Sequence, residues 1–161
     1  MKRRALISAL ILALVILLIA ACGGCITFPV GDNYKIHGTR DNIVSIEIYE
    51  IGYEDEVRDT IGDEIEPKAI LSSERYDEFL DELQSLKDFR EYKIFFALGA
   101  VDPSFKLFGN VVKTSYTGGE IEYISAYDLQ YYYDAEGNKS ISRYFCDIDV
   151  WDAFIAKYTG D

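Results

Sequence analysis

Residues 111–125, VVKTSYTGGEIEYIS, contain two β-strand patterns with a turn between them. The segments 111–116 and 121–125 are rich in β-branched and aromatic residues, which favour strands. Between them, Gly118 and Gly119 can adopt the positive φ angles that a two-residue hairpin loop requires. The stretch therefore predicts an antiparallel hairpin, from which a sheet can be extended in both directions along the chain.

Further strand patterns lie on both sides of this hairpin. Residues 43–51 alternate between apolar and polar positions, as a half-buried strand does. Shorter patterns predict strands near 69–71, 92–96, 129–133 and 140–146, and the turn at 135–138 offers Gly137 for a left-handed position. Together these segments predict an antiparallel meander sheet of about five to six strands.

Two amphipathic helices are predicted to cover one face of that sheet. The first begins after Ser72 or Ser73 as its cap, and the second begins after Asp147 or Asp149 and ends at Gly160. Their apolar residues recur at helical spacing: Tyr76, Phe79, Leu80, Leu83 and Leu86 in the first, and Val150, Trp151, Phe154, Ile155 and Tyr158 in the second. The predicted fold class is therefore α+β, with both helices on the same face of the meander.

The first 22 residues have the order of an export signal. Residues 2–4 are basic, residues 5–18 are apolar except for Ser8, and residues 19–22 read Ile-Ala-Ala-Cys. An uncleaved transmembrane helix is the alternative, although the apolar run is at or just below the short end of what spans a bilayer. Both interpretations place the chain after the leader outside the cytoplasm, because the basic residues 2–4 stay on the cytoplasmic side of the membrane.

The ending Ile19-Ala20-Ala21-Cys22 resembles the lipobox of bacterial lipoproteins. The resemblance implies that signal peptidase cleaves before Cys22, after a diacylglycerol has been joined to its sulfur. It thus implies a signal peptide over residues 1–21 and a bacterial membrane protein anchored by covalent lipid at Cys22, with its domain facing outside the cytoplasm. Gly23 is not the aspartate that resembles an inner-membrane retention signal, so an outer and a cytoplasmic membrane both stay open.

A tether and one domain are expected after the signal peptide. Residues 22–41 contain Gly, Pro, Asn and Asp with little periodicity, which is typical of a flexible tether. Residues 42–161 carry the regular patterns and are long enough for one compact core but not for two. We therefore expect a single α+β domain over 42–161.

The chain is strongly acidic. Its net charge of -12 becomes -15 when residues 1–21 are removed, because Lys2, Arg3 and Arg4 leave and no acid does. This balance argues against a nucleic-acid partner, which needs a basic surface to displace counterions. It also repels anionic lipid, so membrane attachment has to come from acyl chains.

The residues show no pattern typical of catalysis or of a metal site. The sole histidine, His37, falls in the expected tether, where an imidazole is not held rigidly in a cleft. The acidic segment 54–66 and the turn 134–138 do not fit the calcium-loop spacing, so neither a metal nor another cofactor is expected. Cys25 and Cys146 are able to pair in an oxidising compartment, but a buried thiol is the favoured expectation for Cys146.

Exposed aromatic residues are the best candidates for a contact surface. Alternation predicts that Tyr132 points opposite to Tyr131 and Tyr133, so at least one of the three faces solvent or a partner. The candidate surface consists of Tyr127, Tyr131, Tyr132 and Tyr133, with Phe105 and Phe108 from the apolar segment 97–109. Two other interpretations of these residues stay open. The tyrosines are frequent because tyrosine favours strands, and segment 97–109 folds back over the end of the sheet.

Three classes of function follow from these features. The first is a lipid-anchored extracytoplasmic binding or accessory module, whose partner is a cell-envelope or secreted protein. The second is an immunity or inhibitor lipoprotein that neutralises a basic toxin or enzyme by charge complementarity. The third is a small surface hydrolase that uses a pair of carboxylates, although nothing in the sequence singles out two of its many acids.

Overall fold

The computed structural model describes residues 25–52, 61–62, 64–87, 89–97, 107, 109–125, 130–142 and 144–160. The chain divides into two compact units, Met1–Phe28 with Lys93–Pro103, and Pro29–Tyr92 with Ser104–Asp161. Within the described ranges, no helix combines the length and the apolar character needed to cross a bilayer. Both helices and the larger sheet belong to the second unit.

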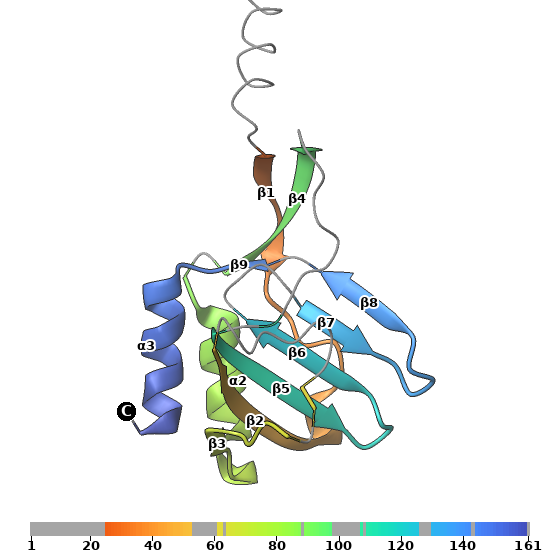
Figure 1. Ribbon diagram of the computed structural model, residues 1–161, viewed down its shortest axis with the longest axis vertical. Coiled ribbons are helices and arrows are strands. Elements are labelled where there is room, and N and C mark those ends of the chain that lie inside the picture. Colours follow the sequence, from red (N-terminus) through yellow and green to blue (C-terminus); the bar gives the residue numbers. More distant parts are fainter. Residues whose placement is uncertain are drawn as a thin grey trace, which may run out of the picture. The chain divides into compact units, whose positions relative to one another are not determined.

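The larger sheet has six antiparallel strands (Figure 1). Their spatial order is β3 (Ala69–Ile70), β2 (Ile43–Ile51), β5 (Gly109–Tyr116), β6 (Ile121–Ser125), β7 (Gln130–Tyr133) and β8 (Lys139–Ser142). The strands from β5 to β8 follow one another as a meander. The expected α+β fold with an antiparallel sheet is therefore confirmed.

The hairpin that joins β5 to β6 has a longer loop than expected. The main-chain N–H of Gly119 donates to the carbonyl of Tyr116 at 3.0 Å, and the N–H of Tyr116 donates to the carbonyl of Glu120 at 3.0 Å. Gly119 has φ 93°, whereas Gly118 does not have a positive φ. This is a three-residue loop with one left-handed glycine, and the β7–β8 hairpin has the same form with Gly137 at φ 82°.

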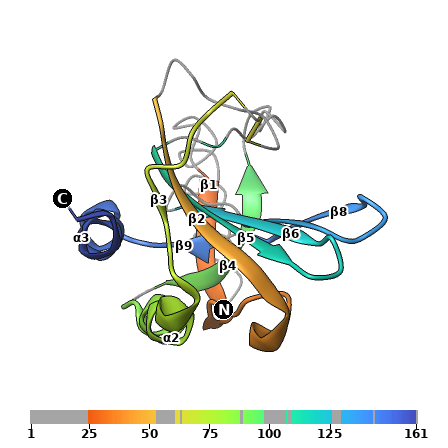
Figure 2. The ribbon, with the colours of Figure 1, turned by 90° about the horizontal axis from the view of Figure 1, so that it is seen from below.

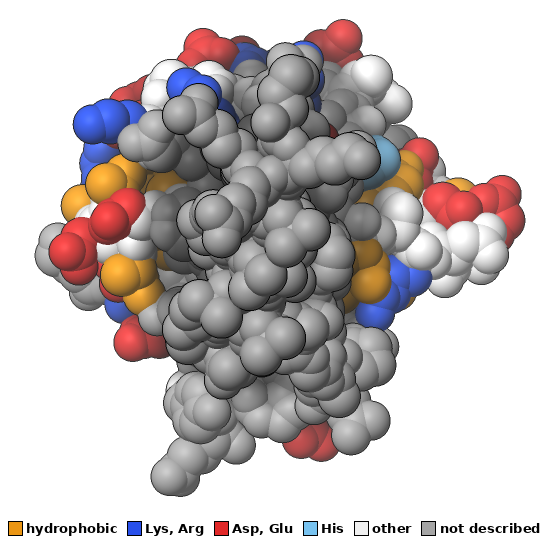
Figure 3. Space-filling model, turned by 90° about the horizontal axis from the view of Figure 1, so that it is seen from above, with side chains coloured by type: hydrophobic (Ala, Val, Ile, Leu, Met, Phe, Trp, Pro, Cys, Tyr) orange, Lys and Arg blue, Asp and Glu red, His pale blue; other side chains and the backbone are white. Residues whose placement is uncertain are grey.

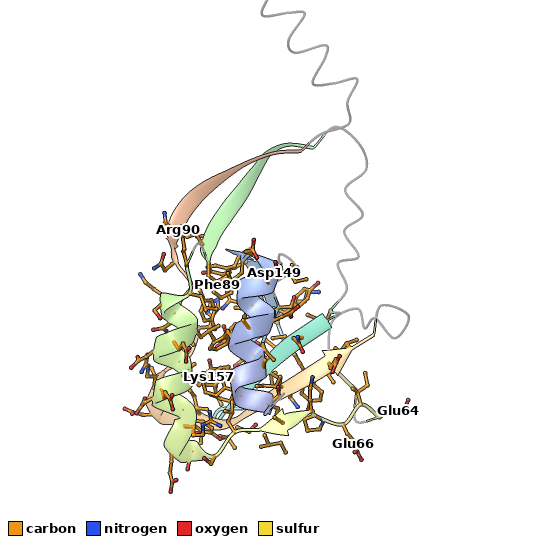
Figure 4. All side chains as sticks on the ribbon, turned by 90° about the vertical axis from the view of Figure 1, so that its left-hand side faces the viewer. Glu64, Glu66, Phe89, Arg90, Asp149 and Lys157 are labelled. Carbon is orange, nitrogen blue, oxygen red and sulfur yellow. The ribbon has the colours of Figure 1, made fainter. Side chains whose placement is uncertain are left out.

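The two helices are α2 (Tyr76–Ser85) and α3 (Ile148–Thr159), which lie side by side (Figure 4). Both cover the same face of the larger sheet, as predicted, because their apolar residues belong to one core cluster with residues of β2, β5 and β6. This first core contains Phe79, Leu80 and Leu83 of α2, Trp151, Phe154, Ile155 and Tyr158 of α3, and Ile46, Ile48, Val112 and Ile124 of the sheet.

The helix ends were predicted unequally well. The side chain of Asp147 accepts hydrogen bonds from the N–H groups of Asp149 and Val150 at 2.9 and 3.4 Å, and Gly160 ends α3 with φ 81°. Ser72, by contrast, makes no side-chain cap bond. A 3₁₀ turn, η2 (Ser73–Arg75), precedes α2 instead.

Residues 25–41 are not the flexible tether that their composition predicts. They contain β1 (Cys25–Asn33), which lies in a three-stranded sheet of order β1, β4 (Arg90–Ala97) and β9 (Tyr144–Phe145). Directly after β1, Tyr34 is buried in the first core with 2% of its surface exposed. The buried Tyr34 ring anchors this segment to the sheet.

The segment 140–146 also differs from its prediction as one strand. It divides into β8 and β9, which belong to the two different sheets. Cys146 lies just after β9 and is a buried thiol in the first core, with 2% of its surface exposed. This is the state that the sequence analysis favoured for Cys146.

The opposite face of the larger sheet carries a second core. Seven buried residues form it: Tyr49, Ile51, Ile61, Leu107, Val111, Tyr123 and Tyr131. The sequence predicted a covered face only on the helix side. The tyrosine rings instead give the second face its own apolar cluster, which accounts for much of the tyrosine density of the strands.

Candidate functional site

A carboxylate is buried on the helix-covered face of the larger sheet. Glu122 of β6 is 1% exposed. Its side chain accepts hydrogen bonds from the Tyr34 hydroxyl at 2.6 Å, the Tyr116 hydroxyl at 2.8 Å and the His37 main-chain N–H at 3.1 Å. The Gln130 side-chain amide is a fourth donor. We call these five residues the Glu122 network.

Four parts of the chain meet at this carboxylate. Tyr116, Glu122 and Gln130 come from the adjacent strands β5, β6 and β7, while Tyr34 and His37 come from the segment that follows β1. A carboxylate has about four lone-pair positions, and here each is used by a neutral donor. Desolvation of the charge is thereby offset by hydrogen bonds.

The two tyrosines of the network are held in their protonated form. Burial, followed by the negative charge of Glu122, raises the pKa of Tyr34 well above its ordinary value. The same two causes raise the pKa of Tyr116. Both hydroxyls therefore remain donors throughout the physiological pH range, and the network fastens the segment after β1 to the sheet.

Sequence reasoning missed Glu122, although a signal was present. Alternation in β6 places Glu122 on the same face as Ile124, which lies in the first core. A charged residue at an inward position of a strand needs a set of hydrogen-bond donors. These donors come from distant parts of the chain, so the sequence alone does not identify them.

Beside the Glu122 network, His37 and Tyr132 stack on each other. Their ring centroids are 4.1 Å apart and the ring planes differ by 16°. Tyr132 is half-buried and His37 is exposed. The histidine that was expected in a flexible tether is therefore packed against β7.

Four carboxylates act on the pKa of the Tyr132 hydroxyl. Partial burial raises the pKa of Tyr132, and the carboxylates of Glu120, Asp134, Glu122 and Glu136 raise it further. Figure 3 shows acidic and hydrophobic side chains close together at the right-hand rim, where Figure 1 places the β7–β8 hairpin. We define the Tyr132 surface as His37, Glu120, Tyr132, Asp134 and Glu136.

The other candidate tyrosines have different positions. Tyr131 is 1% exposed in the second core, and Tyr133 packs against the same core with its ring 6.2 Å from that of Tyr123. The alternation predicted for residues 131–133 is thus observed, and of these three tyrosines only Tyr132 lies outside the second core. Four further candidates lie outside the described residues: Cys22, Phe105, Phe108 and Tyr127.

The acidic outer face of α2 is largely paired within the chain. Arg40 contacts Asp81 at 2.6 Å and Asp77 at 3.4 Å, and Lys157 of α3 contacts Glu82 at 2.6 Å and Glu78 at 3.1 Å. Figure 4 labels Lys157 on α3, beside α2. These pairs reduce the negative charge that this face offers to a partner, so it is a weaker candidate than the Tyr132 surface.

The chemistry open to the Glu122 network is limited by its burial. A carboxylate that is 1% exposed and accepts four hydrogen bonds is an acceptor that positions its neighbours, not a base that meets a substrate. Among the residues that the structure describes, no cluster of three or more His, Cys, Asp or Glu side chains is arranged to hold a metal ion.

Comparison of the chain with protein-family models, curated proteins and solved structures finds no match.

Gly38 offers a test of how tightly the segment after β1 packs on the sheet. A Cβ atom at this position would lie 2.4 Å from Cε1 of the Tyr116 ring. We expect Gly38→Ala to lower the free energy of unfolding by about 2 kcal/mol, as overpacking does. Urea denaturation measures this loss. Gly62→Ala is the control, because no atom lies within 4 Å of its added Cβ; equal midpoints for the two variants would contradict the packing described here.

Proposed function

We propose that this chain is a bacterial lipoprotein whose domain acts outside the cytoplasm as a binding or accessory module, attached to the membrane by lipid at Cys22. The leader supports the attachment, since basic, apolar and small residues occur in the order of a lipoprotein signal and end at Cys22. The charge of -15 after removal of residues 1–21 disfavours attachment through anionic headgroups. Acyl chains supply it instead.

The proposed contact surface is the Tyr132 surface. One observation carries this choice: a half-buried aromatic ring stacks on His37 and lies on the same face of the sheet as Glu120 and Asp134. Tyrosine offers rigid apolar contact area with a polar tip, and such residues provide much of the affinity of protein interfaces. The carboxylates favour a partner whose matching surface is basic.

An immunity or inhibitor lipoprotein is the second candidate function, and the acidic residues of the Tyr132 surface favour it as well. In this case the partner is a basic toxin or enzyme, and binding neutralises it. The activity of the purified partner, measured with and without this protein, separates the two candidate functions. An inhibitor has to bind its target tightly and abolish the target's activity, whereas an accessory module leaves the partner's activity intact. A neighbouring gene for a secreted basic protein would favour the inhibitor.

Replacement of the proposed lipidated cysteine tests the attachment. We expect Cys22→Ser to release the domain from the membrane fraction or to leave it as an uncleaved precursor, because serine lacks the sulfur that accepts the diacylglycerol. Fractionation of cells followed by mass spectrometry of the protein measures both outcomes. A Cys22→Ser protein that is still processed and still membrane-bound would contradict the lipoprotein assignment.

Cross-linking on whole cells tests the contact surface. We expect Tyr132→Ala to lower the yield of the specific adduct at least tenfold, since loss of an interface hot spot costs about 2 kcal/mol or more. Ile70→Ala is a matched control at the opposite edge of the sheet, where Ile70 is 67% exposed. An adduct that survives Tyr132→Ala, or that does not weaken with added salt, would exclude the Tyr132 surface as the acidic contact.

A further inference from the structure

The strand β8 ends the larger sheet on one side. It pairs with β7, with Tyr131 opposite Ile141 and Tyr132 opposite Ser140. Figure 2 shows β8 on the side of the sheet away from α3. Among the described strands, β8 pairs with β7 on one side and with no strand on the other.

The register determines which main-chain groups of β8 point outward. At the turn, the N–H of Asp134 donates to the carbonyl of Asn138 at 3.1 Å, so this pair is hydrogen-bonded. Hydrogen-bonded and non-hydrogen-bonded pairs alternate along an antiparallel ladder. Tyr132 and Ser140 therefore form a bonded pair, while Ile141 lies in a non-bonded one. The N–H and C=O groups of Ile141 point away from β7, toward the outer edge.

The side chain of Ile141 adds an apolar contact at this edge. It is 47% exposed and lies on the same face as Tyr131. An edge strand with an outward donor, an outward acceptor and an exposed β-branched side chain is a template for a further strand. The opposite edge is less suitable, because β3 has only two residues.

Charge selects the kind of segment that this edge accepts. Tyr132 lies directly opposite Ser140, and Asp134 and Glu136 lie at the end of β7 and in the turn that leads into β8, so this part of the Tyr132 surface borders β8. Lys139 is the basic residue of β8, and its ammonium lies 4.5 Å from the centre of the Tyr131 ring, on the other face. A second copy of the chain would bring a charge of -12 against another -12, whereas a basic segment is attracted.

We infer that the β8 edge binds an extended, basic segment of a partner protein, which adds a strand to the sheet through the main chain of Ile141. Lysine or arginine side chains of this segment reach Asp134 and Glu136 of the Tyr132 surface, while its apolar side chains pack against Ile141. The inference rests on the proposed binding function and specifies the chemistry of the partner. Main-chain pairing supplies affinity, and the alternation of basic and apolar residues supplies specificity.

A peptide titration tests this pairing. The probe is a dye-labelled peptide of sequence Lys-Val-Lys-Val-Lys-Val-Lys with blocked ends, and the protein is the full chain in detergent micelles. Fluorescence polarisation should show that the affinity for the peptide falls at least tenfold when every main-chain nitrogen of the peptide is methylated. Methylation removes the main-chain hydrogen-bond donors of the peptide but keeps its charge. The Glu-Val counterpart should not bind. Equal affinity of the methylated and unmethylated peptides, or no binding of either, would overturn the inference.

Two measurements place the peptide on β8. Ile141→Pro removes the outward N–H at a position where an edge strand tolerates proline, and it should weaken peptide binding at least tenfold, whereas Ile70→Ala should not. Independently of any variant, bound peptide should slow hydrogen exchange of the Ile141 amide in the wild-type chain. An unchanged exchange rate would overturn the assignment to this edge, and so would a dimer of the unliganded chain that Ile141→Pro dissolves.

The two proposals fail in different ways. An adduct on whole cells that Tyr132→Ala abolishes but Ile141→Pro preserves would refute pairing at the β8 edge and leave the binding function standing. If the wild-type chain forms no specific adduct on cells, the binding function itself fails.

Discussion

Replacement of Glu122 by glutamine is expected to lower the free energy of unfolding by about 3 kcal/mol. The carboxylate is 1% exposed and accepts four hydrogen bonds. Glutamine keeps one acceptor oxygen and replaces the other by an NH₂ group. If the NH₂ takes the place of Oε2, it faces the His37 main-chain N–H, which cannot turn away, and a buried donor is left unsatisfied.

Chemical denaturation of the purified protein measures this loss. Glu74→Gln is the matched control, because Glu74 is exposed on the turn before α2, and a change there should stay within about 0.5 kcal/mol. A Glu122→Gln protein that unfolds at the same denaturant concentration as the control would show that the network contributes nothing to stability.

Truncation of Tyr34 is expected to have an effect of similar size. The Tyr34 ring lies 5.1 Å from that of Phe89 and 5.4 Å from that of Tyr144, and its hydroxyl donates to Glu122. Tyr34→Ala removes both the ring and the donor, and we expect a loss of about 4 kcal/mol. Tyr34→Phe keeps the ring and should cost about 2 kcal/mol, the value for a hydrogen bond to a charged group.

Thermal or chemical unfolding separates these contributions. Thr39→Ala is the control in the same segment, since its side chain is exposed and makes no cap bond. Tyr34→Phe and Glu122→Gln should also be non-additive when combined, because the two side chains are direct partners in one hydrogen-bond network. Strictly additive losses would indicate that the two side chains act independently; a Tyr34→Ala protein as stable as the Thr39→Ala protein would restore the tether interpretation.

The position of Tyr34 also bears on the proposed attachment. A flexible tether over residues 22–41 would let the domain move some distance from a lipid anchor. With β1 beginning at Cys25, only Gly23 and Gly24 lie between Cys22 and the first described strand. The proposed lipidation thus implies a short connection between the acyl chains and ordered structure.

The elements with strong local patterns were predicted well. Residues 43–51 and 121–125 form strands with the expected boundaries, and alternation correctly separated Tyr132 from Tyr131 and Tyr133. Asp147 and Gly160 mark the ends of α3 because cap chemistry acts within a few residues. These features depend on neighbours along the chain, which the sequence displays directly.

The elements that depend on distant contacts were not predictable in the same way. Residues 25–33, with a proline and two acidic or amide residues, have little alternation, and they become β1 through pairing within a second sheet. The division of 140–146 has a similar origin, because β8 pairs with β7 while β9 pairs with β4. A strand pattern indicates extended backbone, but it does not identify the partner strand.

By itself, then, the sequence determined the α+β class, the two amphipathic helices, the central hairpin and the acidic charge, since each follows from periodicity, turn chemistry or composition. The tertiary structure alone decided that Glu122 is buried among donors from three other parts of the chain and that His37 stacks on Tyr132. It also decided that the other tyrosines fill a second core. The physical reason is that a buried charge or a half-covered ring acquires its properties from groups brought together by folding, and these groups are as far apart in the chain as Tyr34 and Glu122.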